Sequence, residues 1–209
     1  AEFRVLSDGT EIELTAAAYA YEQSPLMERV TKTVTAAGSG QEQTSVEETY
    51  GEAAAYPYAA GQIKFTRDIA GVETFYDYEA AAEHGAAHKK TAITKVGGEL
   101  AAGQSRKTES FLAANDTVLV EQESVWDGDN WLLLSSGAHE YDEEGRRTKT
   151  IRGNGRVTST SWMCCGKLSE TDEDGILTSY GYNSAHQLVE TIRSEISDGD
   201  TVVTPETIT

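Results

Sequence analysis

The sequence predicts an all-β protein, an extended and twisted antiparallel sheet made of consecutive β-hairpins. Threonine, serine, tyrosine and valine are prominent, and 3 prolines and 19 glycines among 209 residues favour strands joined by tight turns. Tyrosine pairs of the form Tyr-x-Tyr recur along the chain, and polar breaks that contain glycine follow one another roughly every ten residues between 142 and 175. These three observations indicate an array of repeats instead of a domain with one central core.

A period of about 20 residues is visible in the spacing of the aromatic residues. Tyr-x-Tyr occurs at 19–21, 56–58, 76–78 and 180–182. Tyr141, Trp162 and Tyr182 follow one another at intervals of 21 and 20 residues. Residues 68–78 and 172–182 coincide without a gap at one Asp, one Gly, one Thr and both tyrosines. Such a period is typical of repeat architectures.

The chain is predicted to be a single β-hairpin repeat array over 1–209, with a regularity that changes along its length. Residues 1–55 are irregular repeats, with a turn at Asp8-Gly9, strands near 12–21 and 30–34, and a flexible break at 36–40. Residues 56–139 are degenerate repeats, with strands at their two Tyr-x-Tyr pairs and longer loops at 97–110 and 113–117. Residues 140–193 are clear repeats, and 194–209 are a terminal strand or a tail. The alanine clusters 16–18, 53–55 and 80–82 are expected at strand ends or loop edges, because short isolated helices are marginal.

Alternation along the strands predicts the role of the aromatic residues. Ile176, Thr178, Tyr180 and Tyr182 share one face of a strand, since side chains alternate with a period of two. We therefore interpret the tyrosine pairs as residues that pack one hairpin on the next, in preference to residues that stack on a ligand. The packing aromatics that define the repeat are Tyr56, Tyr58, Tyr76, Tyr78, Tyr141, Trp162, Tyr180 and Tyr182.

The segments EYDEEGRRTKT, STSWMCCGKLSET, DEDGILTSYGYNSAHQL and RDIAGVETFYDYE resemble the RHS/YD-repeat family. The family pattern is matched residue by residue at Tyr141, Asp142, Gly145, Arg146, Asp172, Gly175, Thr178, Tyr180 and Tyr182, and the chain departs from it at Trp162, Met163, Lys167, Asn183 and His186. The resemblance covers 140–193 well and 56–79 less well. It implies a bacterial secreted or cell-surface protein in which hairpins form a continuous sheet, in some members a shell around a toxin. This chain would then be an open fragment of a larger shell or spiral.

Charge and hydropathy exclude several kinds of partner. The formal net charge of −18 repels nucleic acid and anionic membrane surfaces. No apolar run approaches the roughly 20 residues needed to cross a bilayer, and the first residues, AEFRVLSDGT, lack the stages of a signal peptide. The expected location, outside a bacterial cell or on its surface, follows from the resemblance alone.

Cys164 and Cys165 fall on a predicted hairpin turn. A disulfide between them would be strained, because neighbouring Cα atoms lie about 3.8 Å apart, below the roughly 4.4 Å at which disulfides begin. A vicinal disulfide, two free thiols and a bond to another molecule all stay open. A redox-catalytic role is disfavoured because the Cys-x-x-Cys spacing is absent.

Three other groups could hold a metal or a sugar, but each has a simpler explanation. His84 and His88 have the i, i+4 spacing of metal ligands on a helix, yet Gly85 argues against a helix, so exposed loop histidines are expected. The acidic segments 127–130, 172–174 and 198–200 lack the spacing of a calcium loop and are interpreted as turns. Trp126 and Trp131 flank the first of these turns, where packing across strands is favoured over stacking on a glycan.

No motif for nucleophilic, metal-assisted or nucleotide-dependent catalysis is present, so we expect no catalytic residues, metal or cofactor. The predicted function is a structural scaffold or a shell-wall segment. A carbohydrate- or surface-binding adhesin module is the alternative. Expected partners are other repeats of the parent protein and further copies of this chain, joined through sheet edges or aromatic faces, and a glycan in the alternative.

Overall fold

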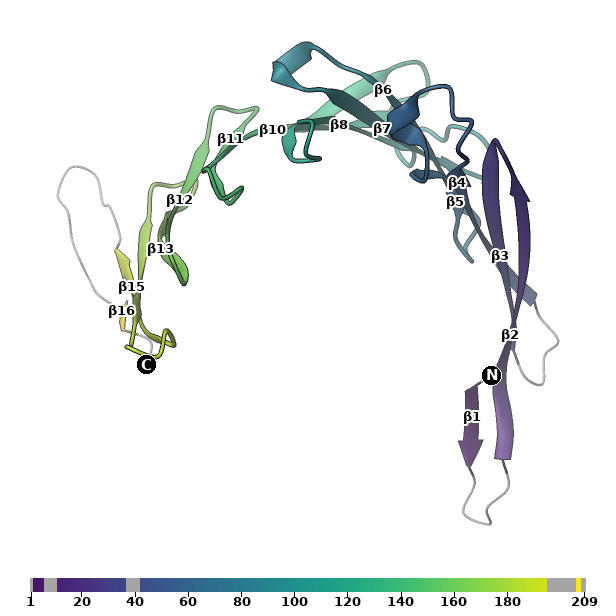
Figure 1. The fold of residues 1–209 in the computed structure, drawn as a ribbon, viewed down its shortest axis with the longest axis horizontal. Helices are drawn as coiled ribbons and strands as arrows, with labels where there is room; N and C mark the ends of the chain where they lie inside the picture. Colours follow the sequence, from purple (N-terminus) through teal and green to yellow (C-terminus); the bar gives the residue numbers. More distant parts are fainter. Residues whose placement is uncertain (1, 6–10, 37–41, 195–205, 208–209) are drawn as a thin grey trace.

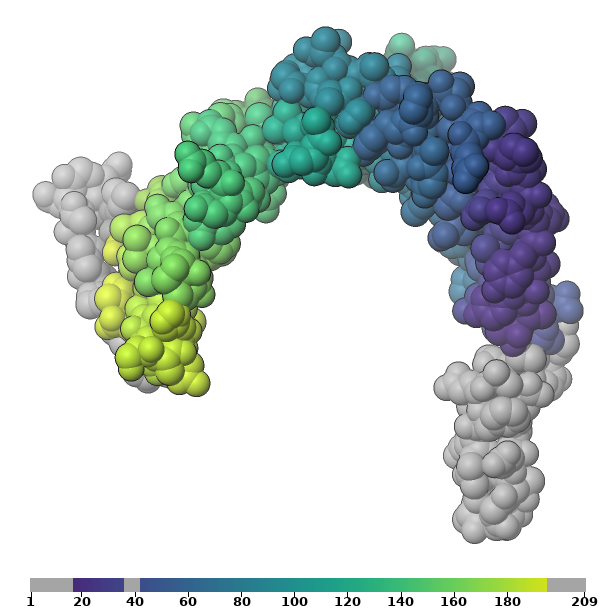
Figure 2. Space-filling view, viewed as in Figure 1, coloured from purple at the N-terminus to yellow at the C-terminus, as the bar shows by residue number. Residues whose placement is uncertain are grey.

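The computed structural model is one antiparallel sheet of 16 strands that follow one another in chain order. It describes residues 2–5, 11–36, 42–194 and 206–207, with side chains over 17–35 and 42–194. The sheet bends into an open arc whose two ends lie far apart (Figure 1), and the wall of the arc is thin around a wide hollow (Figure 2). The predicted all-β hairpin array is confirmed. No helix among the described residues is long and apolar enough to cross a membrane.

The strands are β1 (Glu2–Val5), β2 (Glu11–Ser24), β3 (Met27–Ala36), β4 (Glu42–Tyr50), β5 (Ile63–Arg67), β6 (Val72–Ala80), β7 (His88–Val96), β8 (Arg106–Leu112), β9 (Val118–Trp126), β10 (Trp131–Tyr141), β11 (Arg147–Arg152), β12 (Val157–Met163), β13 (Gly166–Thr171), β14 (Leu177–Tyr182), β15 (Leu188–Ser194) and β16 (Glu206–Thr207). Two short 3-10 turns, η1 (Pro57–Ala59) and η2 (Glu83–Gly85), lie in the loops on either side of β5 and β6.

One type of five-residue turn recurs at six places: 68–72, 113–117, 142–146, 152–156, 172–176 and 183–187. In each, the first N–H donates to the fifth carbonyl, and the fourth N–H donates to the first carbonyl. The fourth residue has a positive φ, which favours glycine. Glycine holds this position in four of the turns, while Asp116 (φ 65°) and His186 (φ 61°) hold it in the others. Asn183 and His186, which depart from the family pattern, therefore keep the geometry of Asp172 and Gly175.

Four hairpins share a β-bulge immediately after their turn, where one strand advances by one residue and its partner by two. The pairs that close the bulges are Leu112↔Val118, Tyr141↔Arg147, Trp162↔Lys167 and Tyr182↔Leu188. A predicted packing aromatic thus precedes three of the four turns. Because a bulge bends its strand, its repetition contributes to the curvature of the arc.

Few residues are buried, and all of them lie in the middle of the array. Among residues 17–35 and 42–194 they are Glu48, Gly51, Ala59, Tyr78, Ala86, Ser105, Phe111, Leu112, Val120 and Ser124. The loops 51–62 and 81–87 supply three of them, and Ala86 packs with Phe111 and Val120. None of the residues 140–193 is buried. The regular repeats are therefore held by strand pairing and contacts between neighbouring hairpins, as expected for repeat proteins.

Three sequence predictions for the first 139 residues are wrong in detail. The loop expected at 97–110 contains the start of β8 (Arg106–Leu112). Ala16–Ala18 lie inside β2 and pair with Thr35, Val34 and Thr33 of β3, so backbone pairing with β3 outweighs the low strand propensity of alanine. Tyr56 and Tyr58 lie in a loop and not in a strand, because Pro57 begins the turn η1. The predictions at Asp8-Gly9 and 198–200, and most of that at 36–40, concern residues outside the described ranges.

Candidate interaction surface

The strand register places the packing aromatics on one face of the sheet, which we call the ladder face. Two series of directly paired residues define it: His139↔Thr150↔Thr158, and Thr160↔Glu170↔Thr178. Because side chains alternate, Tyr141, Trp162, Tyr180 and Tyr182 lie on this same face. The pairings from β10 back to β6 bring Tyr76 and Tyr78 to it as well. The predicted sharing of one face is confirmed for these strand residues.

Three of these aromatics join neighbouring strands through their polar atoms. The Tyr141 hydroxyl donates to the Val118 carbonyl at 2.7 Å. The Trp162 indole N–H donates to the Arg147 carbonyl at 2.9 Å. The Tyr182 hydroxyl donates to the Lys167 carbonyl at 2.9 Å. Each ring lies at the end of a strand and bonds to the beginning of the preceding strand, so the aromatic period of the sequence is a period of inter-strand contacts.

The Arg146 side chain reinforces the contact at Trp162. Its guanidinium lies 5.8 Å from the centre of the indole ring, within the range of a cation–π interaction. One of its nitrogens donates to the Met163 carbonyl at 3.1 Å, and another bonds Asp142 at 2.7 Å. The turn at 142–146 is thereby fixed to the turn that follows β12.

Loop 51–62 places a second aromatic cluster on the ladder face. The Tyr58 ring stacks on the His88 imidazole, with centroids 3.8 Å apart and an interplanar angle of 7°, and lies edge-on to Tyr78 at 5.9 Å. The Tyr58 hydroxyl donates to Asp116 at 2.6 Å, and the Tyr56 hydroxyl bonds His88 Nδ1 at the same distance. Burial raises the pKa of Tyr78 to about 12. Burial, followed by the hydrogen bond to Asp116, raises the pKa of Tyr58.

The expectation of exposed loop histidines is confirmed for His84, which is exposed in the loop between β6 and β7, and wrong for His88. His88 begins strand β7 and is half-buried under Tyr58. His84 lies in η2 and packs edge-on against Phe111 at 4.8 Å. The sequence gives no signal for these contacts, because they depend on loops that fold over strands far away in the chain.

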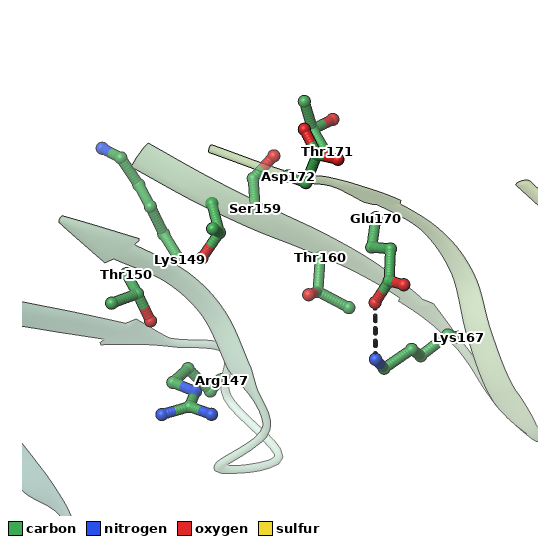
Figure 3. Close-up of a pocket in the computed structure, with 10 residues that line it drawn as sticks. Arg147, Lys149, Thr150, Ser159, Thr160, Lys167, Glu170, Thr171 and Asp172 are labelled. Atoms are coloured by element: carbon green, nitrogen blue, oxygen red, sulfur yellow. Dashed lines mark hydrogen bonds and ion pairs between the residues drawn. The ribbon is translucent and has the colours of Figure 1, made fainter. Parts of the chain in front are cut away.

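An open hollow of 330 Å³ lies over β11, β12 and β13. Figure 3 shows Arg147, Thr160 and Lys167 on one side of these strands, and Lys149 and Ser159 on the other. Lys167 bonds Glu170 at 2.6 Å, and the Tyr180 hydroxyl donates to the other oxygen of Glu170 at 2.6 Å.

Opposite pKa shifts follow from this pair of hydrogen bonds. The donations from Lys167 and then Tyr180 lower the pKa of Glu170. Burial and the bond to Glu170 raise the pKa of Tyr180 to about 12. Glu170, one of the two acids that line the hollow, is therefore already paired with the Lys167 amine and the Tyr180 hydroxyl.

The face opposite the ladder carries ion pairs between strands. Glu48 is buried and accepts hydrogen bonds from two guanidinium nitrogens of Arg29, and Lys64 approaches its other oxygen at 3.6 Å. Glu109 bridges Lys89 at 2.8 Å and Lys107 at 2.7 Å. The pairs of Glu48 with Arg29 and of Glu109 with Lys89 join neighbouring strands, whereas Lys107 lies on the same strand as Glu109. A buried acid such as Glu48 depends on its partners.

Trp126 and Trp131 lie on this opposite face. They are directly paired across β9 and β10, and their rings are 5.3 Å apart and tilted by 59°. Lys107 lies 5.8 Å from the centre of the Trp131 ring. This geometry is the expected cross-strand packing.

A free strand edge, which the sequence reasoning missed, is formed by Trp131–Ser135. These residues pair with β9, whereas pairing with β11 begins only at Gly137. Leu132, Leu133 and Leu134 are 50%, 60% and 53% exposed. The signal was the apolar run that follows the turn at 127–130, and such an edge is prone to pair with another strand. At the two ends of the sheet, β1 and β16 also have one strand neighbour each.

The remaining candidates lie in turns. Cys164 and Cys165 form the two-residue loop of the hairpin β12–β13 and are free thiols. The Asp127 and Asp172 carboxylates each accept backbone N–H groups of their own turns. Over the described residues, no three or more His, Cys, Asp or Glu side chains form a group that could hold a metal ion.

No protein-family model matches the chain, and no curated protein does. Among solved structures, a chain of the TcdB2-TccC3-Cdc42 complex matches with 12% identity and a TM-score of 0.29 over 77% of this chain and 10% of its own length. A chain of TcdB2-TccC3 matches with 12% identity and a TM-score of 0.26 over 95% of this chain and 17% of its own length. This chain thus spans less than a fifth of the length of each of these two chains.

Proposed function

We propose that this chain is a structural segment, a scaffold or shell-wall piece of a bacterial extracellular protein of the RHS/YD-repeat kind, without a catalytic role. The observation that carries the proposal is the use of the repeating aromatics. Tyr141, Trp162 and Tyr182 each bond the backbone of a neighbouring strand on one face. Aromatic residues that join neighbouring hairpins in this way extend the sheet into one continuous surface.

The edges of the sheet supply the partners in this proposal. A repeat array leaves unpaired backbone groups at its ends, and these groups pair with further repeats or with other copies of the chain. β1 and β16 are the end strands of the described sheet, and Trp131–Ser135 is a further edge in its interior. Association through edges is therefore the property to test.

The test is light scattering coupled to size-exclusion chromatography over a range of protein concentrations, combined with amide hydrogen exchange. A scaffold segment forms reversible oligomers, and exchange slows at β1, β16 or residues 131–135 as the concentration rises. A chain that stays monomeric, with unchanged exchange at all three edges, contradicts the proposal.

A second candidate, glycan binding, is favoured by one region of the ladder face. Tyr19 and Tyr21 are 54% and 74% exposed, unlike the bonded aromatics of the later repeats. Tyr19 borders a 470 Å³ hollow that Lys32 also lines. Exposed aromatic rings of this kind stack on sugars.

A glycan array with the wild-type chain and the Tyr19→Ala, Tyr21→Ala double variant tests this candidate. Binding to a glycan that the double variant loses, while Phe75→Ala on the opposite face retains it, supports an adhesin. Absence of binding by the wild type rejects it.

A further inference from the structure

The hairpin β12–β13 ends in two adjacent thiols. Met163 pairs with Gly166, so Cys164 and Cys165 alone make up the loop. Their sulfur atoms lie 2.6 Å apart, with Cys164 exposed and Cys165 half-buried. Of the hairpin turns described above, this one presents a pair of nucleophiles to solvent.

Contacts from both neighbouring hairpins hold this loop in place. Arg146 donates to the Met163 carbonyl at 3.1 Å, immediately before the first thiol. Immediately after Cys165, Gly166 lies against the Tyr182 phenol, and a Cβ at Gly166 would collide with that ring. The same phenol donates a hydrogen bond to the Lys167 carbonyl at 2.9 Å. The loop is therefore fixed at both ends, and its sulfurs stay close to each other.

A base lies beside the second thiol. His186, the fourth residue of the turn at 183–187, places Nε2 4.0 Å from the Cys165 sulfur. The hydrogen bond to Cys164, together with partial burial, raises the pKa of Cys165. Cys165 is thus the thiol that needs help in losing its proton, while Cys164 is the more accessible one.

We propose that Cys164 and Cys165 are a dithiol site that reacts reversibly with low-molecular-weight disulfides. The Cys164 thiolate attacks one sulfur of a disulfide RSSR, forms a mixed disulfide and releases RS⁻. His186 takes the proton of Cys165, whose thiolate then attacks the Cys164 sulfur and releases the second RS⁻. In sum, two cysteine thiols are oxidised to one disulfide, and RSSR is reduced to two RSH.

The bridge that forms is easily opened again. Adjacent Cα atoms are held about 3.8 Å apart by the peptide bond, closer than the range of about 4.4 to 6.8 Å in relaxed disulfides. Strained and exposed disulfides have more oxidising potentials and are labile. The site therefore suits a reversible modification and not a permanent crosslink.

Titration of the fully reduced chain with 5,5′-dithiobis(2-nitrobenzoate), followed by intact-mass spectrometry, tests the proposal. The wild type is expected to release two thionitrobenzoate ions per chain and to become lighter by two hydrogens, with no adduct. Cys165→Ser, which keeps the attacking thiol, should release one ion and keep one adduct. A wild type that carries an adduct on each cysteine, or a single lasting adduct, overturns the proposal.

Two further measurements test its parts. Stopped-flow mixing should show a longer-lived mixed disulfide in His186→Gln than in the wild type, and an unchanged lifetime overturns the role of His186. Reduced glutathione should reopen the oxidised pair, and a bridge that resists glutathione overturns its assignment as a reversible site. Circular dichroism of each variant confirms that the sheet is retained.

Discussion

The equivalence of the turns at 172–176 and 183–187 makes a reciprocal mutational prediction. Gly175 and His186 both hold the fourth position, with φ of 83° and 61°. If both turns require this positive φ at their fourth position, Gly175→Ala should destabilise the protein and His186→Gly should stabilise it. Gly137→Ala is a matched control, because Gly137 is not among the residues with positive φ and an added Cβ would come no closer than 3.5 Å to its nearest neighbour.

The magnitudes follow from two opposing effects on the free energy of unfolding. The left-handed conformation costs a residue with a Cβ about 1–2 kcal/mol. Replacing glycine also restricts the unfolded chain, which stabilises the fold by about 0.4–1 kcal/mol. Gly175→Ala therefore destabilises by about 1 kcal/mol, and His186→Gly stabilises by slightly less, since histidine tolerates this region better than alanine. Gly137→Ala retains only the second effect and stabilises by about 0.4–1 kcal/mol.

Urea unfolding followed by circular dichroism measures these differences, and native-state hydrogen exchange over β14 and β15 locates them. A change of 1 kcal/mol corresponds to about 2–4 °C in Tm for a chain of this size. A neutral Gly175→Ala, or a destabilising His186→Gly with unchanged exchange elsewhere, would show that the two turns are not equivalent and refute the reasoning.

Three further predictions follow from the ladder face and the free edge. Tyr182→Phe keeps the ring but loses its hydrogen bond, so urea unfolding should show a loss of about 0.5–1.5 kcal/mol. The folded state raises the pKa of Tyr180 to about 12, above the value of about 10 for an unfolded chain. The contribution of Tyr180 to stability is therefore complete below about pH 10 and is lost as the pH rises to about 12. Urea midpoints measured across this range should fall less in Tyr180→Phe than in the wild type. Leu133→Lys should weaken self-association in light scattering. Leu168→Lys, which replaces an exposed leucine on an interior strand, should leave self-association unchanged. Equal effects of the two substitutions would exclude the edge at 131–135 as a contact.

Local patterns in the sequence predicted the regular part of the fold. Two-residue alternation placed Tyr180 and Tyr182 on one face, and glycine with aspartate marked the turns at 142–146 and 172–176. These features are set by backbone conformation and strand geometry within a few residues, so they can be inferred without knowledge of distant contacts.

Other features depend on contacts that the local sequence does not encode. The stacking of Tyr58 on His88 requires loop 51–62 to fold over β6 and β7, which Pro57 permits but does not specify. The hydrogen bond from the Tyr58 hydroxyl to the Asp116 carboxylate joins residues that are 58 positions apart in the chain. The edge at Trp131–Ser135 exists because β11 ends early, and the length of a strand is among the features least fixed by its own residues.

Small-angle X-ray scattering of the monomer, collected on the eluting peak of a size-exclusion column, tests most directly whether the hairpins form one open, curved surface. An arc one sheet thick gives a radius of gyration well above the value of about 17 Å expected for a compact domain of this length. A radius near that value, with the scattering profile of a globule, would mean that the hairpins fold onto one another, and it would contradict the continuous array on which the proposed scaffold function rests.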